Sequence, residues 1–485
     1  MLFNSFEYIF FFLPASFLLY FYLHRAKWTE AAKLSLIGAS LFFYGWWNAS
    51  YLIIILASIF FNFVVGILLR ENTLLSGTAK KAVLIFGISA NLALLGYFKY
   101  MNFFLENLND LLGTSFSYLQ IALPLGISFF TFQQITYLVD SYKKVIKEHS
   151  FLNYMLFVTF FPQLIAGPIV HHKEMLPQFA SKHNWIKNHR NIAMGLFIFS
   201  IGLFKKVMIA DRFATWASKG FDTAESLNML EAWVTSLSYT FQLYFDFSGY
   251  TDMAIGAALL FNIKLPINFD SPYKATNIQD FWRRWHMTLT RFLKDYLYIP
   301  LGGNRRGEVR TYLNILTVFL LAGIWHGAGW TFIFWGFLHG VALIVHRVWR
   351  RFNLTMPSIL AWFLTFNFIN IAWIFFRAKN FDDAIKVLDG MFFGNLVLPA
   401  ALHSKLADLE EYGIEFGSYL GGIGAGKTAL VLLFIAFVVT LFAKNSTEQI
   451  FKSKVGKVKM VYASLLFSVS VLSLNRVSEF IYFNF

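Results

Sequence analysis

The sequence predicts an all-α polytopic membrane protein, and its composition and hydropathy pattern support that fold class. Of the 485 residues, 57% are hydrophobic, 20% are aromatic and only 14% are charged, and the mean hydropathy is +0.55. Apolar runs long enough to cross a bilayer recur along the whole chain, with basic residues in every second connection. We expect about 11–13 transmembrane helices, with re-entrant and amphipathic helices, in one integral-membrane domain covering 1–485.

The net charge and the absence of cysteine narrow the possible functions. A formal charge of +14 would suggest nucleic acid as the partner of a soluble chain. In a membrane protein it indicates basic cytoplasmic loops facing an anionic bilayer, so we expect lipid and no nucleic acid. With no cysteine, disulfides, thiolate catalysis and cysteine-bound metals are excluded.

The first apolar run has no basic residues before it, which favours a retained span over a cleaved signal peptide. Basic loops follow the first, third and fifth runs, whereas 48–50 and 102–117 contain no Lys or Arg. The positive-inside rule therefore places the N-terminus outside. Single crossings are predicted near 8–23, 34–47, 51–69, 82–99, 120–139, 192–210, 357–376, 429–443 and 460–475.

The run at 151–169 does not fit this alternation as a simple crossing. It contains Pro162 and the pair Gly167-Pro168, which break helices. We expect a re-entrant segment, covered by protein or lining a cavity.

A longer run, 230–262, is predicted to be a tilted or broken span with two carboxylates at membrane depth, Asp246 and Asp252. Asp246 and Tyr250 lie four residues apart and share a helix face. Either at least one of the two acids lines a pore, or Gly249 breaks the helix and both acids face lipid headgroups.

The stretch 277–330 is the centre of the predicted site. Its first half has the pattern of an amphipathic helix, with polar residues from Asp280 to Asp295 on one face and aromatic residues on the other. His286 lies within the apolar arc. We expect this helix at the cytoplasmic membrane surface or dipping into the bundle.

The second half begins a hairpin of two spans, 312–326 and 329–346, without Lys, Arg, Asp or Glu between Thr311 and Val345. His326 lies where the glycines at 327 and 329 split the spans, toward the outer side. A titratable ring at that depth must have a partner or line a water-filled cavity. His339, in the second arm, either supports His326 or is a hydrogen-bonded core residue.

Segment 378–427 carries seven acidic against four basic residues, which predicts an extracytoplasmic loop. Its end, GGIGAGKT at 421–428, satisfies the phosphate-binding P-loop pattern. A P-loop needs a buried strand before it and an α/β fold around it, and the sequence predicts neither. We therefore interpret it as a flexible entry to the next span. No convergent set of metal-ligating residues is evident, so we expect no metal.

Several motifs together resemble one protein family. FWRRWHMTLTRFLKDYLYIPLGGNR (281–305) and LAGIWHGAGWTFIFWGFLHG (321–340) are similar to blocks of the membrane-bound O-acyltransferase (MBOAT) superfamily, in its bacterial alginate O-acetyltransferase branch. PLGISFFTFQ (124–133), FPQLIAGPI (161–169), QLYFDFSGYTDMAIG (242–256) and the ending FIYFNF (480–485) also resemble that branch. The teichoic acid D-alanine transfer protein is similar mainly around the two histidines.

The resemblance implies a ring of helices around a central tunnel, with a catalytic core at about 120–350. It implies a catalytic histidine at His326 and a second functional histidine at His286. The sequence leaves open whether His326 acts as a general base or carries the acyl group itself. Candidates for lining the substrate tunnel are Asp246, Tyr250, Trp282, Trp285, Trp325 and Asn314.

The implied reaction moves an acetyl group from a cytoplasmic thioester, acetyl-CoA or another acyl donor, across the bacterial inner membrane. The acceptor would be an extracytoplasmic polysaccharide, such as an alginate-like polymer or peptidoglycan, with a periplasmic SGNH-type acetyltransferase as partner. Acetyl-CoA is a substrate, and no permanently bound cofactor is expected. Arg283, Arg284 and Arg305 could bind donor phosphates, or they are ordinary positive-inside residues.

Two alternatives remain at this point. A polytopic transporter or flippase would share the buried acids and broken helices, but no second copy of the 277–330 block exists. A scaffold that only anchors periplasmic enzymes would tolerate replacement of both histidines.

Overall fold

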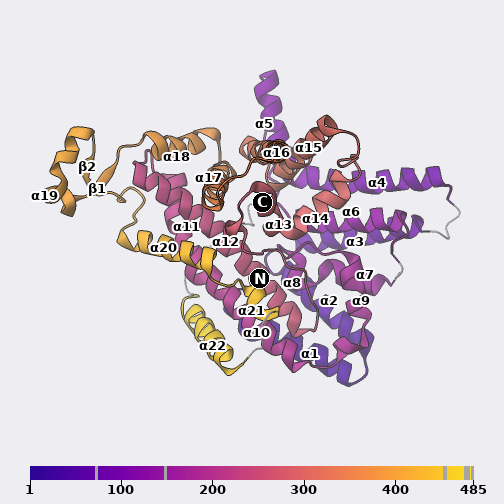
Figure 1. The fold of residues 1–485 in the computed structure, drawn as a ribbon. Coiled ribbons are helices and arrows are strands. Elements are labelled where there is room, and N and C mark those ends of the chain that lie inside the picture. Colours follow the sequence, from indigo (N-terminus) through magenta and orange to yellow (C-terminus); the bar gives the residue numbers. More distant parts are fainter. Residues whose placement is uncertain (71–74, 147–149, 452–455, 475–480, 482–485) are drawn as a thin grey trace. The chain divides into compact units, whose positions relative to one another are not determined.

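The computed structural model describes residues 1–70, 75–146, 150–451, 456–474 and 481, and its regular structure is almost entirely helical (Figure 1). The sheet found in this part of the chain consists of two short parallel strands, β1 (Val397–Pro399) and β2 (Glu415–Gly417). The predicted all-α membrane class is confirmed. Among the described residues, seven helical segments are long and apolar enough to span a membrane: Glu7–Arg25, Ser50–Leu68, Gly77–Leu112, His189–Thr223, Glu308–His326, Trp330–Arg351 and Ser358–Arg377.

Contacts between α-carbons group the chain into two compact units. The first unit contains Met1–Phe204, Tyr250–Ile267 and the C-terminal helix α22. Its helices are α1 (Leu13–Arg25), α2 (Thr29–Gly45), α3 (Ser50–Leu68), α4 (Gly77–Leu95), α5 (Met101–Leu112), α6 (Ile127–Tyr142), α7 (Phe151–Thr159), α8 (Phe161–Leu164), α9 (His172–Ala180), α10 (His189–Phe204) and α22 (Lys457–Leu472). Of the block 480–485, the structure describes only Ile481.

The second unit contains Lys205–Gly249 and the chain from Asn268 through helix α21. It holds every residue of the candidate site described below. Its helices are α11 (Asp211–Ser218), the first part of α12 (Met229–Leu260), α13 (Ile278–Arg284), α14 (Met287–Leu293), α15 (Glu308–His326), α16 (Trp330–Arg351), α17 (Ser358–Arg377), α18 (Phe381–Phe393), α19 (His403–Leu406), α20 (Lys427–Phe442) and α21 (Ser446–Phe451).

Helix α12 runs without interruption for 32 residues, or about 48 Å at the usual rise of an α-helix. The possibility that Gly249 breaks this span is therefore wrong. Asp246 and Asp252 are both buried, so neither faces solvent in the structure.

The segment 151–169 is not one helix. Helix α7 has nine residues and α8 only four, too few to cross a bilayer. The backbone between them is satisfied within the first unit, because the Phe161 N–H donates to Ser40 Oγ (3.1 Å). Gln163 Nε2 also donates to the Phe157 carbonyl (2.6 Å). The break near Pro162 follows the sequence prediction.

The amphipathic helix predicted for the first half of the 277–330 stretch is divided, so the prediction of one helix is wrong. Asn277 caps α13 by accepting the Asp280 N–H (2.8 Å), and the helix ends at Arg284. His286 then adopts a left-handed conformation (φ 42°, ψ 53°) before α14 begins. A side chain with a Cβ is strained there, so surrounding contacts must hold the backbone in place.

The hairpin of α15 and α16 forms as predicted, with both helices side by side (Figure 1). Gly323 and Gly336 allow this close approach. A Cβ at Gly323 would lie 2.3 Å from the Phe332 carbonyl oxygen, and one at Gly336 would lie 2.3 Å from the Phe319 carbonyl oxygen. The close packing places the end of α15, with His326, against the start of α16.

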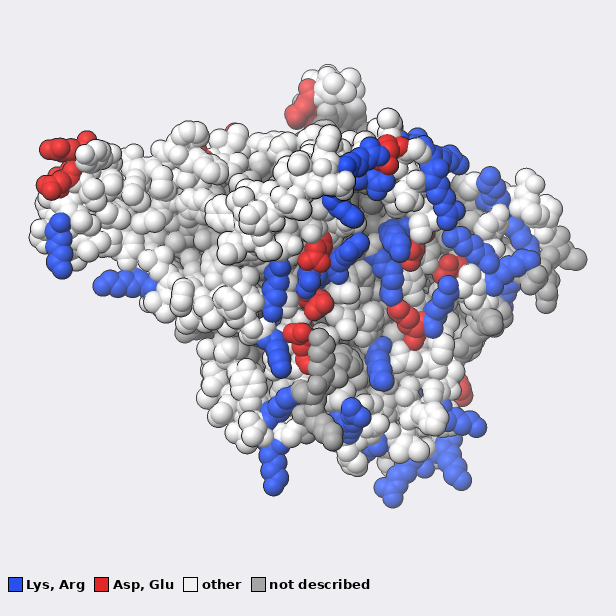
Figure 2. Space-filling view, in the orientation of Figure 1, with Lys and Arg blue, Asp and Glu red and all other residues white. Residues whose placement is uncertain are grey.

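The predicted extracytoplasmic segment contains α18, the two strands and α19. Figure 2 shows acidic side chains gathered near α19, and the exposed acids in this segment include Asp408, Glu410, Glu411 and Glu415. In the glycine-rich stretch that follows, the Gly422 N–H donates to Glu231 Oε1 (2.6 Å). A carboxylate of the chain itself thus occupies the loop, which supports the structural interpretation over nucleotide binding.

Candidate active site

His326 is the last residue of α15, and its side chain is enclosed by aromatic rings. The residue is 5% exposed. Its ring centroid lies 5.1 Å from Trp335 at a near-perpendicular angle, 5.0 Å from Phe376 and 4.7 Å from the neighbouring Trp325. These walls keep bulk water from the imidazole.

His286 is held by one residue, Asn268, which the sequence analysis did not identify. Asn268 Oδ1 lies 3.0 Å from His286 Nδ1 and accepts both the Thr288 hydroxyl (2.9 Å) and the Thr288 N–H (3.3 Å). The Asn268 carbonyl accepts the Met287 N–H (3.0 Å). Asn268 therefore stabilises the strained turn and orients the imidazole. The only sequence signal was one amide in the apolar run LPINF.

These contacts fix the tautomer of His286. A backbone N–H can only donate, so the Asn268 atom facing Thr288 must be the amide oxygen. His286 Nδ1 must then carry the proton, which leaves Nε2 with its lone pair. Within the described part of the chain, Nε2 has no hydrogen-bond partner. Burial lowers the pKa of His286 to about 3, so the ring is neutral at physiological pH.

His339 has the opposite tautomer. Trp282 Nε1–H donates to His339 Nδ1 (3.2 Å), so the proton of the neutral ring is on Nε2. His339 is fully buried. The hydrogen bond from Trp282 agrees with the interpretation of His339 as a core residue, although its Nε2 has no partner among the described residues.

Tryptophans connect the three histidines into one cluster. Trp325 lies between His286 and His326, with ring centroids 6.4 Å and 4.7 Å away. Trp335 lies between His326 and His339, at 5.1 Å and 4.8 Å. The structure thus brings both predicted histidines together with Trp282 and Trp325. We call His286, His326, His339 and the rings between them the histidine cluster.

Trp285 borders this cluster, and its ring lies 5.0 Å from Trp373 and 5.1 Å from Phe269. Neither Trp335 nor Phe376 was singled out from the sequence, because an apolar span contains many aromatic residues and only the folded chain selects among them.

Three other predicted site residues, Asp246, Tyr250 and Asn314, make contacts with residues outside the histidine cluster. Asp246 Oδ1 pairs with Lys206 Nζ (2.6 Å). Tyr250 belongs to the first unit and stacks on Phe3. Asn314 donates to the Gly303 carbonyl (2.9 Å) and so fixes the loop before α15.

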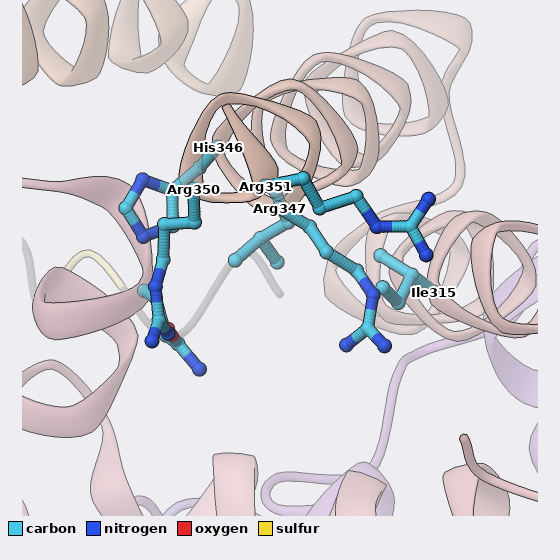
Figure 3. Close-up of a pocket in the computed structure, with 7 residues that line it drawn as sticks. Ile315, His346, Arg347, Arg350 and Arg351 are labelled. Carbon is cyan, nitrogen blue, oxygen red and sulfur yellow. The ribbon is translucent and has the colours of Figure 1, made fainter. Parts of the chain in front are cut away.

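The predicted donor-phosphate residues do not converge. Arg284 pairs with Asp280 (2.9 Å), while Arg283 and Arg305 are exposed. The structure instead shows a basic pocket of about 350 Å³ at the end of α16 (Figure 3). The sequence HRVWRR, which places arginines three and four residues apart on one helix face, was the available signal. The pocket is lined by Gln279, Ile315, Leu343, His346, Arg347, Arg350 and Arg351.

The described residues contain no group of three or more His, Asp or Glu side chains arranged to hold a metal ion. The histidine cluster places neutral imidazoles in an apolar enclosure, and a neutral imidazole can remove a proton or act as a nucleophile.

Comparisons with known proteins agree with the motifs. The model of the membrane-bound O-acyltransferase family matches residues 83–381, which include the whole 277–330 stretch. The peptidoglycan O-acetyltransferase of Helicobacter pylori is 50% identical over 517 aligned positions, covering 100% of this chain and 98% of the relative. The probable alginate O-acetylase AlgI of Pseudomonas aeruginosa is 38% identical, covering 84% and 78% of the two chains.

A more distant relative is the teichoic acid D-alanyltransferase of Bacillus subtilis, 28% identical over 53% of this chain and 69% of the relative. The expected resemblance and the expected enzyme class, an O-acyltransferase, are both confirmed, in preference to a transporter or a scaffold. The buried histidine cluster, the family match and the full-length relatives together show that this chain belongs to the membrane-bound O-acyltransferase family.

Proposed function

We propose that this protein transfers an acetyl group from acetyl-CoA in the cytoplasm to a glycan outside the bacterial inner membrane. The observation that carries the proposal is the enclosure of His326 by aromatic rings, next to a second neutral imidazole. The acetyl group and the glycan acceptor in this proposal are inferred from the names of the relatives. Peptidoglycan is the favoured acceptor, because the relative that carries that name matches the full length of this chain.

In the proposed reaction, the neutral imidazole of His326 acts on the thioester. As a general base it accepts the proton of an acceptor hydroxyl while the oxygen attacks the acetyl carbonyl. The carbon–sulfur bond breaks, and the CoA thiolate leaves and takes up that proton. As a nucleophile, an imidazole nitrogen of His326 would attack the thioester carbonyl first, which breaks the carbon–sulfur bond and gives an acyl-imidazole while the ring proton passes to the departing CoA thiolate. In a second step the acceptor hydroxyl attacks this acyl group, the nitrogen–acyl bond breaks, and the hydroxyl proton returns to the imidazole. The dry enclosure protects either species from hydrolysis.

His286 acts on the donor side in this proposal. Its Nε2 lone pair is available to accept a proton, because Asn268 holds the proton on Nδ1. A periplasmic SGNH-type acetyltransferase is proposed as the partner that completes transfer to the polymer, since the described residues contain no soluble catalytic domain.

Reconstitution tests the proposal. The purified protein is inserted in the membrane of proteoliposomes that enclose labelled acetyl-CoA. Peptidoglycan fragments and the partner enzyme are then added outside the vesicles. We expect labelled ester on the external glycan with the wild type and none with His326→Ala. Label transfer that persists in the variant at equal protein level would reject the role of His326. If the wild type uses no acetyl-CoA, the proposed donor is wrong.

A further inference from the structure

The basic pocket at the end of α16 has an unbalanced positive charge. Glu308 accepts from Arg347 Nε (3.1 Å) and Nη2 (3.3 Å), and it also pairs with Arg351. Arg350 Nη1 donates only to the neutral amide oxygen of Gln279 (3.4 Å), and no carboxylate in the described part of the chain lies within ion-pair distance of it. One carboxylate thus faces three guanidinium groups, which suits a ligand with phosphate groups.

The side chains are arranged so that one cation remains available. Figure 3 shows Arg350 beside His346 on one side of the pocket, whereas Arg347 and Arg351 extend toward the other side, where Ile315 lies. An anion entering on the Arg350 side would meet that guanidinium without breaking the ion pairs of Glu308.

The pocket is one helical turn away from the histidine cluster on three helices at once. Gln279 lies one turn before Trp282 on α13, Ile315 one turn before Phe319 on α15, and Leu343 one turn after His339 on α16. The inner three rings contact one another, with centroids 5.1 Å (Trp282–Phe319), 5.2 Å (Trp282–His339) and 6.3 Å (Phe319–His339) apart. They form the layer next to the pocket.

The next layer contains the proposed catalytic residue. Trp335 lies one helical turn before His339 on α16, and its ring centroid is 5.1 Å from that of His326. From Arg350 to Trp335 the chain advances 15 positions (350 − 335), or about 22 Å along α16. This separation is comparable to the length of an extended phosphopantetheine arm, the part of CoA that joins the nucleotide phosphates to the thioester.

We propose that the pocket around Arg350 binds the phosphates of the donor thioester and that the arm follows α16 toward His326. The inference rests on the proposed function, because it assigns the donor end of the same site. It places the phosphates on Arg350 and not on Arg283, Arg284 or Arg305. The ring of Trp282 lies in the layer between the pocket and the proposed catalytic residue.

Binding measurements on the full-length protein in lipid nanodiscs test this assignment. The probe is CoA, with pantetheine, which lacks phosphates, as the matched ligand. Arg350→Gln should raise the dissociation constant for CoA about tenfold and leave that for pantetheine unchanged. Arg310→Gln removes the same charge from an exposed position on α15, the helix that also carries the pocket residue Ile315, and should change CoA binding by less than about twofold.

Each outcome decides between the possibilities. Equal loss of CoA affinity in both variants, or none in either, overturns the site. Equal affinity of the wild-type protein for CoA and pantetheine would also overturn the phosphate site, and this test needs no variant. If phosphatidylglycerol in the nanodisc displaces CoA only from proteins that retain Arg350, the shared phosphate site stands. If lipid binds there and CoA does not, the donor assignment fails. Wild-type acetyl transfer from acetyl-CoA with an unchanged Michaelis constant in Arg350→Gln rejects this inference alone, not the proposed function.

Discussion

Two buried polar groups in the second unit differ in how completely their polar atoms are paired. In the ion cluster, Lys206 Nζ lies 2.6 Å from Asp246 and 2.8 Å from Asp211. In the histidine cluster, each of His286 and His339 uses one ring nitrogen and leaves the other without a partner in the described part of the chain. Burial is similar, since Lys206, Asp246 and His286 are all at most 3% exposed.

The difference separates structure from chemistry. A buried charge is costly unless it is paired, and in the ion cluster each charge lies within 2.8 Å of an opposite charge. A neutral imidazole can be buried with one nitrogen unused at a smaller cost, and that nitrogen can then act on a substrate.

Removing the imidazole of His326 should have the largest effect. We expect His326→Ala to reduce acetyl transfer about 10³-fold or more, because both possible mechanisms need the ring. Some stability should be lost as well, because the ring packs against Trp335 and Phe376 and its removal leaves a cavity. The measurement is ester formation per folded molecule in reconstituted vesicles.

The control is another buried histidine. In the first unit, His172 Nδ1 lies 3.6 Å from Asp140 Oδ2, and burial lowers the pKa of His172 to about 4. His172→Ala should lower thermal stability but keep transfer per folded molecule. Comparable loss of transfer in both variants would show that the effect of His326→Ala does not depend on its place in the histidine cluster.

The ion cluster should respond in stability and not in turnover. Lys206→Met leaves Asp246 buried without its cation, so we expect a loss of about 3 kcal/mol in the free energy of unfolding. The double variant Lys206→Met/Asp246→Leu should recover much of this loss. Thermal denaturation in detergent measures both. No recovery in the double variant would contradict the view that Asp246 has a mainly structural role.

The amide of Asn268 should control the pH dependence of activity. In the wild type the pKa of His286 is about 3, so the ring stays neutral between about pH 5 and pH 8. Asn268→Asp places a carboxylate beside Nδ1, which favours the imidazolium and raises this pKa. Protonation removes the Nε2 lone pair. Activity should therefore fall on the acid side at a higher pH than in the wild type, about tenfold between pH 8 and pH 5.

A flat pH profile of transfer in Asn268→Asp, with Asn268→Gln as a neutral control, would show that the protonation state of His286 does not matter for the reaction.

The smallest effect is expected at Trp282. Trp282→Phe keeps an aromatic ring at this position but removes the indole N–H that donates to His339, at a cost of about 1 kcal/mol in stability. Turnover should fall a few-fold, because His339 is no longer held in one tautomer. Trp233→Phe loses a similar hydrogen bond, to the Met391 carbonyl (3.1 Å), and should lower stability alone. Identical turnover in the two variants would place His339 outside the site.

By itself, the sequence determined the membrane class, the position of most helices, the α15–α16 hairpin and the two candidate histidines, which the fold brings into one cluster. Each of these depends on local composition: apolar runs, helix-breaking residues, and rare titratable rings among apolar neighbours. The tertiary structure decided which polar residue meets which. Asn268 lies 18 positions before His286, and Arg350 lies 71 positions after Gln279, so no periodicity relates them.

The same reason explains the corrections. The helical pattern across 277–298 predicted one continuous helix, but contacts from Asn268 stabilise a left-handed turn at His286 that local propensity disfavours. Asp246 is a candidate for the tunnel because carboxylates are rare in spans, and this stays a prediction; only the folded chain shows that Lys206 pairs with it. Tertiary packing decides which distant polar groups pair, and a local sequence pattern does not determine that packing.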